Sequence, residues 1–202
     1  MRRPTHRAPV HRLALFLLAL PLAVCDTDDV VDGSPTATAE ISAPDDTTTG
    51  VTGTVEFTQD GDDLVMEVSI AGLAPNSTHG FHVHTEGDCG RGDHDDDGYA
   101  EVGGAALGHY DPLGTNDHGG PDDSPGEKHL GDLGNVTADA RGRVSTTITT
   151  DELSIESSRT VIGRSVMVHS DRDDLETDPG GNSGDRIGCA VIPQATVGGS
   201  DD

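Results

Sequence analysis

Apolar and polar residues alternate with a period of two along most of the chain after residue 50. The run 51–58 alternates Val, Gly, Val and Phe with Thr and Glu, and the run 64–70 repeats the pattern with Leu, Met, Val and Ile. Successive side chains of a β-strand point to opposite faces of a sheet, so both runs predict half-buried strands. Asp60-Gly61, which lies between them, is typical of a hairpin turn.

Further strands are expected at 80–84, 143–149, 161–169 and 187–192. No stretch follows the 3.6-residue period of an amphipathic helix over three turns. Two segments, about 85–135 and 170–185, are too long for hairpin connections, and long irregular loops in a compact domain are usually functional. The pattern therefore predicts an all-β fold, an antiparallel sandwich or barrel with two long functional loops.

The composition agrees with a loop-rich β protein and excludes several classes of function. The 202 residues include 27 Gly and only 2% aromatic residues, which excludes a long coiled coil and a polytopic membrane protein. Asp and Glu number 37 against 12 Lys and Arg, a formal net charge of −25. Such a surface repels nucleic acids and anionic membranes, so neither is expected as a partner.

The basic residues indicate the setting in which the chain works. Lys128 is the only lysine, and the remaining basic residues are Arg. Acid-rich, lysine-poor surfaces resemble those of halophilic proteins, because high salt screens the repulsion between like charges. An acidic exported protein of ordinary habitat is the alternative.

The first 25 residues predict an export signal. Four Arg precede an apolar run at 13–24, which is too short to span a bilayer and suits the core of a signal peptide. The run ends at Cys25 in a segment that resembles a bacterial lipobox, whose Cys carries the lipid. Val24 departs from the small residue preferred before that Cys, and a plain secretory signal is the alternative. We therefore expect export to the cell envelope, the periplasm or the exterior, with membrane contact only through an anchor at Cys25.

Composition divides the rest of the chain into a tether, a domain and a tail. Residues 26–49 are rich in Asp, Thr, Ser and Pro and show almost no apolar periodicity, so we expect a disordered tether. The folded domain is expected at 50–196, followed by an acidic tail at 197–202. No long apolar stripe indicates how chains would assemble, and the oligomeric state stays open.

The spacing of the histidines predicts a metal site. His82 and His84 lie two residues apart, so they share one face of the strand expected at 80–84. The other candidate donors follow in the second half of the chain: His109, His118, His129, Asp132 and His169. Seven donors fit two four-coordinate sites only if one His is shared. Nitrogen and oxygen donors without Cys favour Zn, Cu or Ni.

Five segments in this order resemble the copper–zinc superoxide dismutases: GFHVHTEGDC, GHYDP, HGGP, HLGDLGN and GNSGDRIGCAVI. The resemblance runs from about residue 50 to 195 and implies a Greek-key β-sandwich or flattened barrel. It also implies the disproportionation of superoxide to O2 and hydrogen peroxide at a His-bridged Cu/Zn site. A non-catalytic copper- or zinc-binding module, or a copper-delivery module, on the same fold is the alternative. HYDP indicates a bacterial type.

The resemblance implies roles for individual residues. The implied copper ligands are His82, His84, His109 and His169. The implied zinc ligands are His109, His118, His129 and Asp132, so that His109 bridges the two metals and takes part in catalysis. Asp173 matches a carboxylate that links a copper His to a zinc His and fixes their orientation. Arg186 matches the arginine that holds the substrate anion beside copper. Cys89 and Cys189 match the intrasubunit disulfide.

Overall fold

The computed structural model describes residues 33–44, 49–94 and 98–197. The signal peptide expected at 1–25, with Cys25, and the tail beyond Val197 lie outside the described residues. Among the residues described, no helix has the length and apolar character needed to cross a membrane.

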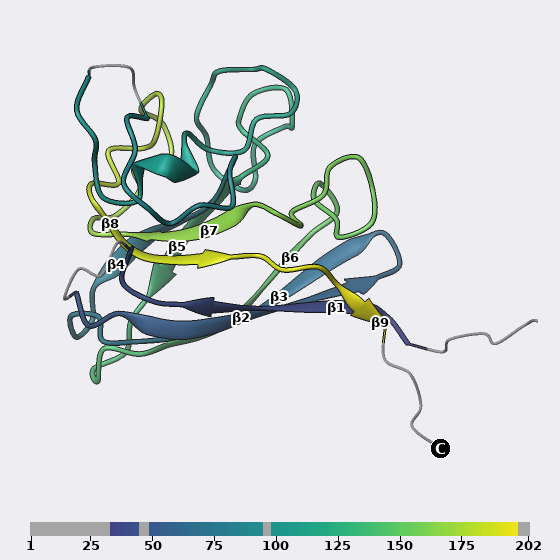
Figure 1. Ribbon diagram of the computed structural model, residues 1–202, viewed down its shortest axis with the longest axis horizontal. Helices are drawn as coiled ribbons and strands as arrows, with labels where there is room; N and C mark the ends of the chain where they lie inside the picture. The colour runs from purple at the N-terminus through teal and green to yellow at the C-terminus, as the bar shows by residue number, and fades with distance from the viewer. Residues whose placement is uncertain (1–32, 45–48, 95–97, 198–202) are drawn as a thin grey trace, which may run out of the picture. The chain divides into compact units, whose positions relative to one another are not determined.

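Two antiparallel sheets make up the fold (Figure 1). The five-stranded sheet has the order β6-β3-β2-β1-β9 and contains β1 (Pro35–Ile41), β2 (Thr52–Asp60), β3 (Asp63–Ala71), β6 (Val144–Thr150) and β9 (Thr196–Val197). The four-stranded sheet has the order β5-β4-β7-β8 and contains β4 (Thr78–His84), β5 (Asp132–Thr137), β7 (Ser165–His169) and β8 (Arg186–Val191). A short 3-10 turn, η2 (Gly104–Ala106), lies between β4 and β5. The all-β prediction is therefore confirmed.

The hairpin between β2 and β3 forms where the sequence predicts it. Asp60 pairs with Asp63, which leaves Gly61 and Asp62 as a two-residue turn. Gly61 has a φ of 61°, a left-handed conformation that glycine adopts without steric cost.

The inner faces of the two sheets form one hydrophobic core. Phe57, Leu64 and Met66 from the five-stranded sheet are fully buried, as are Phe81 and Val83 from the four-stranded sheet. These residues alternate with polar ones along β2 and β3, as expected for strands with one face in the core.

By contrast, β4 and β7 are buried on both faces. Phe81, Val83, Val166 and Val168 enter the core, whereas His82, His84 and His169 lie on the outer face. Two long connections cover that face, one from 85 to 131 and one from 170 to 185 (Figure 1). Both predicted loops are thus present, although the first ends earlier than expected because β5 begins at Asp132.

The segment expected to be a disordered tether contains a strand, and that part of the prediction is wrong. Pro35–Ile41 forms β1, which pairs with β2 over its length and with β9 at its start. Ala37, Ala39 and Ile41 are buried, so the segment does alternate, but Ala and Thr give a weak hydrophobic signal. The folded domain therefore begins before residue 50, and Val197, expected in the tail, belongs to β9.

Candidate metal centre

Seven side chains on the outer face of the four-stranded sheet form two groups of possible metal donors. The first group is His82, His84, His109 and His169, and the second is His109, His118, His129 and Asp132. Within each group, one donor atom from every residue lies within 4.8 Å of the others. His109 belongs to both groups. The structure therefore brings together every donor that the sequence analysis names.

Strand pairing positions the first group. His82 and His84 point outward from β4, and His169 ends β7, which pairs with β4. His109 lies in the long loop but forms a bridge with His84, and the N–H of Tyr110 donates to the carbonyl of Val83 at 2.8 Å. The loop is thereby held against the strand, and the rings of His82 and His109 lie 4.1 Å apart between centroids.

Backbone carbonyls orient two imidazoles of the first group. Nδ1 of His84 donates to the carbonyl of Leu107 at 2.8 Å, and Nδ1 of His169 donates to the carbonyl of Gly184 at 3.2 Å. A neutral imidazole carries one N–H, so each Nε2 keeps a free lone pair. The two Nε2 atoms face each other at 3.3 Å, which suits coordination of a common ion.

Asp173 links the two groups by hydrogen bonds to one histidine of each. Its Oδ2 accepts a hydrogen bond from Nε2 of His82 at 2.7 Å, and its Oδ1 accepts one from Nε2 of His118 at 2.9 Å. Gly181 makes this possible, because a Cβ atom there would collide with Asp173 and His118. Nδ1 of His82 and Nδ1 of His118 are then buried without a hydrogen-bond partner. Buried polar atoms are rarely left unpaired, and a metal ion would satisfy both nitrogens.

The carboxylate of Asp132 forms the centre of the second group. Nδ1 of His109 lies 2.7 Å from it, Nδ1 of His118 lies 3.2 Å from it in a direction that makes no hydrogen bond, and Nδ1 of His129 lies 3.3 Å from it. Three imidazole nitrogens and one carboxylate around a buried point are a donor set that zinc accepts in tetrahedral coordination.

Burial keeps His84, His109 and His169 of the first group neutral. Desolvation lowers the pKa of His84 and of His169 well below the usual value, and desolvation with the neighbouring His82 lowers the pKa of His109 to about 3. Imidazole must be neutral to bind a metal, so protons do not compete for these ligands near neutral pH.

The pKa of His118 shifts in the opposite direction, upward. Burial acts against its charged form, but the carboxylate of Asp132 close by and the hydrogen bond to Asp173 raise the pKa of His118 to about 10. Burial acts to raise the pKa of both carboxylates, but the surrounding histidines, His109 first for Asp132 and His118 first for Asp173, lower it. Asp132 therefore stays ionised, and a divalent cation bound by the second group would replace the proton that the carboxylates hold on His118.

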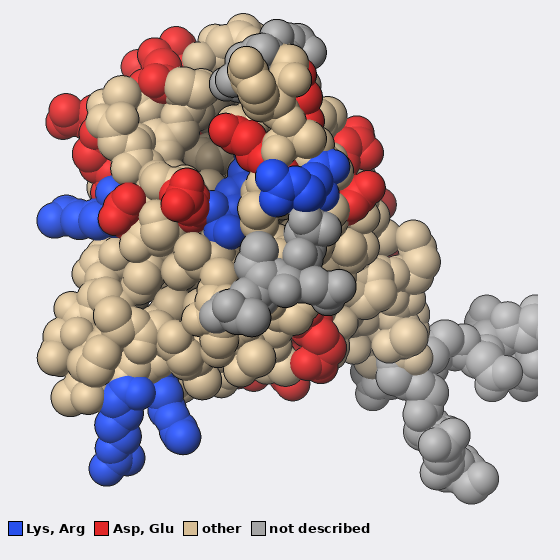
Figure 2. Space-filling model, turned by 60° about the vertical axis from the view of Figure 1, so that its left-hand side comes forward, with Lys and Arg blue, Asp and Glu red and all other residues tan. Residues whose placement is uncertain are grey.

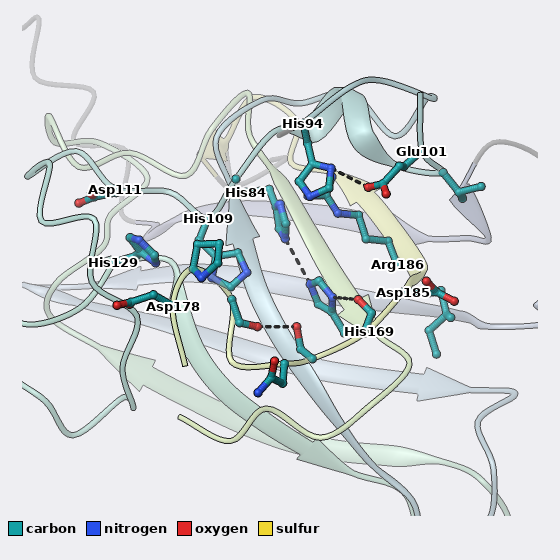
Figure 3. A pocket seen from close by; sticks show the side chains of 18 of the residues that line it. His84, His94, Glu101, His109, Asp111, His129, His169, Asp178, Asp185 and Arg186 are labelled. Atoms are coloured by element: carbon teal, nitrogen blue, oxygen red, sulfur yellow. Dashed lines mark hydrogen bonds and ion pairs between the residues drawn. The ribbon is translucent and has the colours of Figure 1, made fainter. Parts of the chain in front are cut away.

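A cavity of about 850 Å³ leads from the surface to the first group. His84, His109 and His169 line it, and Arg186 at the start of β8 points into it (Figure 3). The Arg186 guanidinium donates hydrogen bonds to the carbonyls of Gly103 and Leu107. Desolvation lowers the pKa of Arg186 to about 10, so the side chain stays cationic at neutral pH. The cavity thus joins a possible metal site to a fixed cation.

A family model described as copper/zinc superoxide dismutase matches residues 51–192, which include all seven donors. The chain belongs to this family. It is 38% identical over 190 residues to the superoxide dismutase [Cu-Zn] of Paramecium bursaria Chlorella virus 1, with 91% of each chain covered. It is 35% identical over 176 residues to the superoxide dismutase [Cu-Zn] of Deinococcus radiodurans, with 87% of this chain and 93% of the relative covered. It is 37% identical over 150 residues to an extracellular superoxide dismutase [Cu-Zn] of Caenorhabditis elegans, with 71% of this chain and 62% of the relative covered.

Membership of the family and the donor groups together establish the activity. The enzyme is an oxidoreductase that disproportionates superoxide to O2 and hydrogen peroxide, and its cofactors are copper and zinc. The resemblance inferred from the sequence is therefore confirmed. The non-catalytic metal-binding alternative is not favoured, because the described site retains both donor groups.

The disulfide of this dismutase is also confirmed. Cys89 in the long loop is bonded to Cys189 in β8. Both pack in a small buried cluster with Ala106 and Met167. The bond therefore holds the loop against the sheet close to Gly103 and Leu107, whose carbonyls position Arg186.

One functional group of the site carries no signal in the sequence. The carbonyl of Leu107 accepts hydrogen bonds from both His84 and Arg186. A backbone carbonyl needs no particular side chain, and only the folded loop places it between the two residues. Leu107 has a φ of 61°, which is uncommon for a residue with a side chain.

Replacing Asp173 with Ala is expected to lower the affinity for zinc by about 10- to 100-fold, because His118 loses the partner that fixes its ring. Zinc affinity can be measured by competition with a chromophoric chelator. Glu176→Ala removes an exposed carboxylate from the same loop and is the matched control. Equal zinc affinities in the two variants would contradict this role of Asp173.

Proposed function

We propose that His82, His84, His109 and His169 bind copper and that His109, His118, His129 and Asp132 bind zinc. The observation that carries this proposal is that His109 belongs to both donor groups. Bound copper supplies one-electron redox chemistry, whereas bound zinc is not redox-active and only orients and polarises its ligands. The orphaned Nδ1 atoms of His82 and His118 support the assignment.

His109 has a second task in this proposal, as a carrier of protons. In the overall reaction one superoxide loses an electron and leaves as O2, and a second gains that electron and two protons and leaves as hydrogen peroxide. Nδ1 of His109 faces Asp132 and stays on the zinc side. A Cβ atom at Gly180 would lie 3.6 Å from Nε2, so the glycine leaves this nitrogen open toward the cavity. When it is not coordinated, Nε2 takes up a proton and delivers it to the substrate.

Arg186 holds the substrate anion in this proposal. Its guanidinium is fixed by two carbonyls and remains cationic, and charge-assisted hydrogen bonds to an anion are among the stronger ones. Such bonds contribute about 1.5–3 kcal/mol, so Arg186→Ala is expected to lower kcat/KM for superoxide by about 10- to 100-fold. Pulse radiolysis measures this constant.

Arg172→Ala is the matched control, because Arg172 lies exposed in the connection between β7 and β8. It is expected to leave kcat/KM nearly unchanged. If both variants were equally active, Arg186 would have no role in holding the substrate.

We also propose that the enzyme is exported and that Cys25 carries a lipid anchor. The disulfide supports an oxidising compartment, and an extracellular relative is compatible with one. The expected result is a mature protein that begins at Cys25, with an intact mass that includes acyl chains. A mature protein that begins beyond Cys25 would contradict the anchor and leave export in place.

A further inference from the structure

The side chains of His94 and Glu101 are in contact at the edge of the cavity, beside Arg186 (Figure 3). Nδ1 of His94 lies 2.7 Å from Oε2 of Glu101, and the two side chains are 30% and 51% exposed. The backbone of Glu101 is paired with that of Gly92 through two hydrogen bonds, and its carbonyl accepts one from Gly104. Neither side chain belongs to a donor group. Their position nevertheless brings a fixed carboxylate to the end of the cavity where an anion would bind.

The carboxylates that line the cavity are Glu101, Asp111, Asp178 and Asp185. Two of them have structural partners, because Asp111 accepts from the backbone of Gly114 and Asn116, and Asp178 accepts from the backbone of His118. Figure 2 shows acidic side chains around the hollow in the upper part of the molecule. An anion that approaches Arg186 therefore meets negative charge before it meets the guanidinium.

Glu101 is the carboxylate that acts on Arg186. Its negative charge raises the pKa of Arg186, against the larger effect of desolvation, which lowers it. The guanidinium cannot turn away from Glu101 without losing the carbonyls of Gly103 and Leu107. An anion held by Arg186 is thus also exposed to the charge of Glu101.

We propose that Glu101, held in place by His94, determines specificity by weakening the binding of dianions at Arg186 more than the binding of monoanions. Coulomb energy is proportional to the charge of the ligand, so a dianion experiences twice the repulsion of a monoanion at the same position. Superoxide is a monoanion, whereas sulfate and hydrogen phosphate are dianions that would compete for a guanidinium. The inference rests on the role of Arg186 proposed above.

Protection of Arg186 against phenylglyoxal tests the inference without catalysis. The protein loaded with copper and zinc is treated at about 0.01 M ionic strength, where the Debye length is about 30 Å. Peptide mass spectrometry follows the adduct at Arg186 as nitrate, a monoanion, or sulfate, a dianion, is added. The concentration dependence gives an affinity for each anion that does not depend on the intrinsic reactivity of the arginine.

Glu101→Gln is expected to raise the affinity for nitrate by about threefold and that for sulfate by the square of this factor, about ninefold. Glu86→Gln removes the same charge from an exposed residue of the loop that does not line the cavity, and both affinities should stay close to those of the unaltered protein. Circular dichroism and an intact Cys89–Cys189 bond establish that each variant is folded.

Two other results would overturn the inference. If Glu101→Gln changed both affinities by the same factor, or changed neither, Glu101 would not discriminate by charge, and the role of Arg186 would be unaffected. If neither anion protected Arg186 in the unaltered protein, the anion-holding role of Arg186 and the inference would fail together.

Discussion

Replacing His109 with Ala is expected to lower superoxide dismutation by more than about 100-fold, because this one side chain belongs to both donor groups. Loss of residues that only support a ligand costs about 10- to 100-fold in metal affinity or activity, and loss of a ligand common to two metals should exceed this. The measurement combines the decay of superoxide with the copper and zinc content of the same sample.

Two comparison variants distinguish the bridge from a general loss of structure. His169→Ala affects the first group alone and is expected to lower bound copper while zinc is kept. His129→Ala affects the second group alone and is expected to lower bound zinc while copper is kept. Only His109→Ala should lower the content of both bound copper and bound zinc. A His109→Ala protein that bound both metals in full and stayed active would refute the shared ligand.

The largest expected effect on stability follows removal of the disulfide. Cys89 and Cys189 are 100 residues apart in sequence, and closing a loop of this length stabilises a folded protein by about 4–5 kcal/mol in the chain-entropy model. The double replacement Cys89→Ser/Cys189→Ser should lower the free energy of unfolding by about this amount, as measured by denaturant unfolding.

Cys25→Ser is the matched control, because Cys25 is the remaining Cys of the chain and takes no part in the bond. Its free energy of unfolding should be unchanged. A fall of less than about 1 kcal/mol in the double variant would mean that the loop is held mainly by its packing in the cluster with Ala106 and Met167.

The sequence predicts the fold best where large apolar residues alternate with polar ones. Phe57, Leu64 and Met66 make β2 and β3 evident before the structure is known. In β1 the inward positions are filled by Ala37, Ala39 and Ile41, and the backbone pairing with β2 supplies much of the order. Small residues that fit a close approach of two sheets resemble the residues of a disordered segment, and the tether prediction fails for this reason.

For the site, spacing along the chain predicts the donors but not what holds them. His82 and His84 share a strand face by geometry alone, so that pairing is predictable. Leu107, Gly184 and Asp173 accept the hydrogen bonds that select the free nitrogen of His84, His169 and His82, and each lies 15 or more residues from the histidine that it bonds. Two of the three partners are backbone carbonyls, which any residue could supply, and only the folded loops bring them to the rings.

Dismutation at a copper and zinc centre bridged by His109 is tested by the rate of superoxide decay in a stopped-flow experiment, on protein whose copper and zinc content is known. Superoxide is expected to decay rapidly when each chain carries one copper and one zinc, and this rapid decay is expected to be lost in His109→Ala. A protein that binds both metals in that ratio and leaves superoxide decay at its spontaneous rate would not be a dismutase, and a metal carrier on the same fold would be favoured.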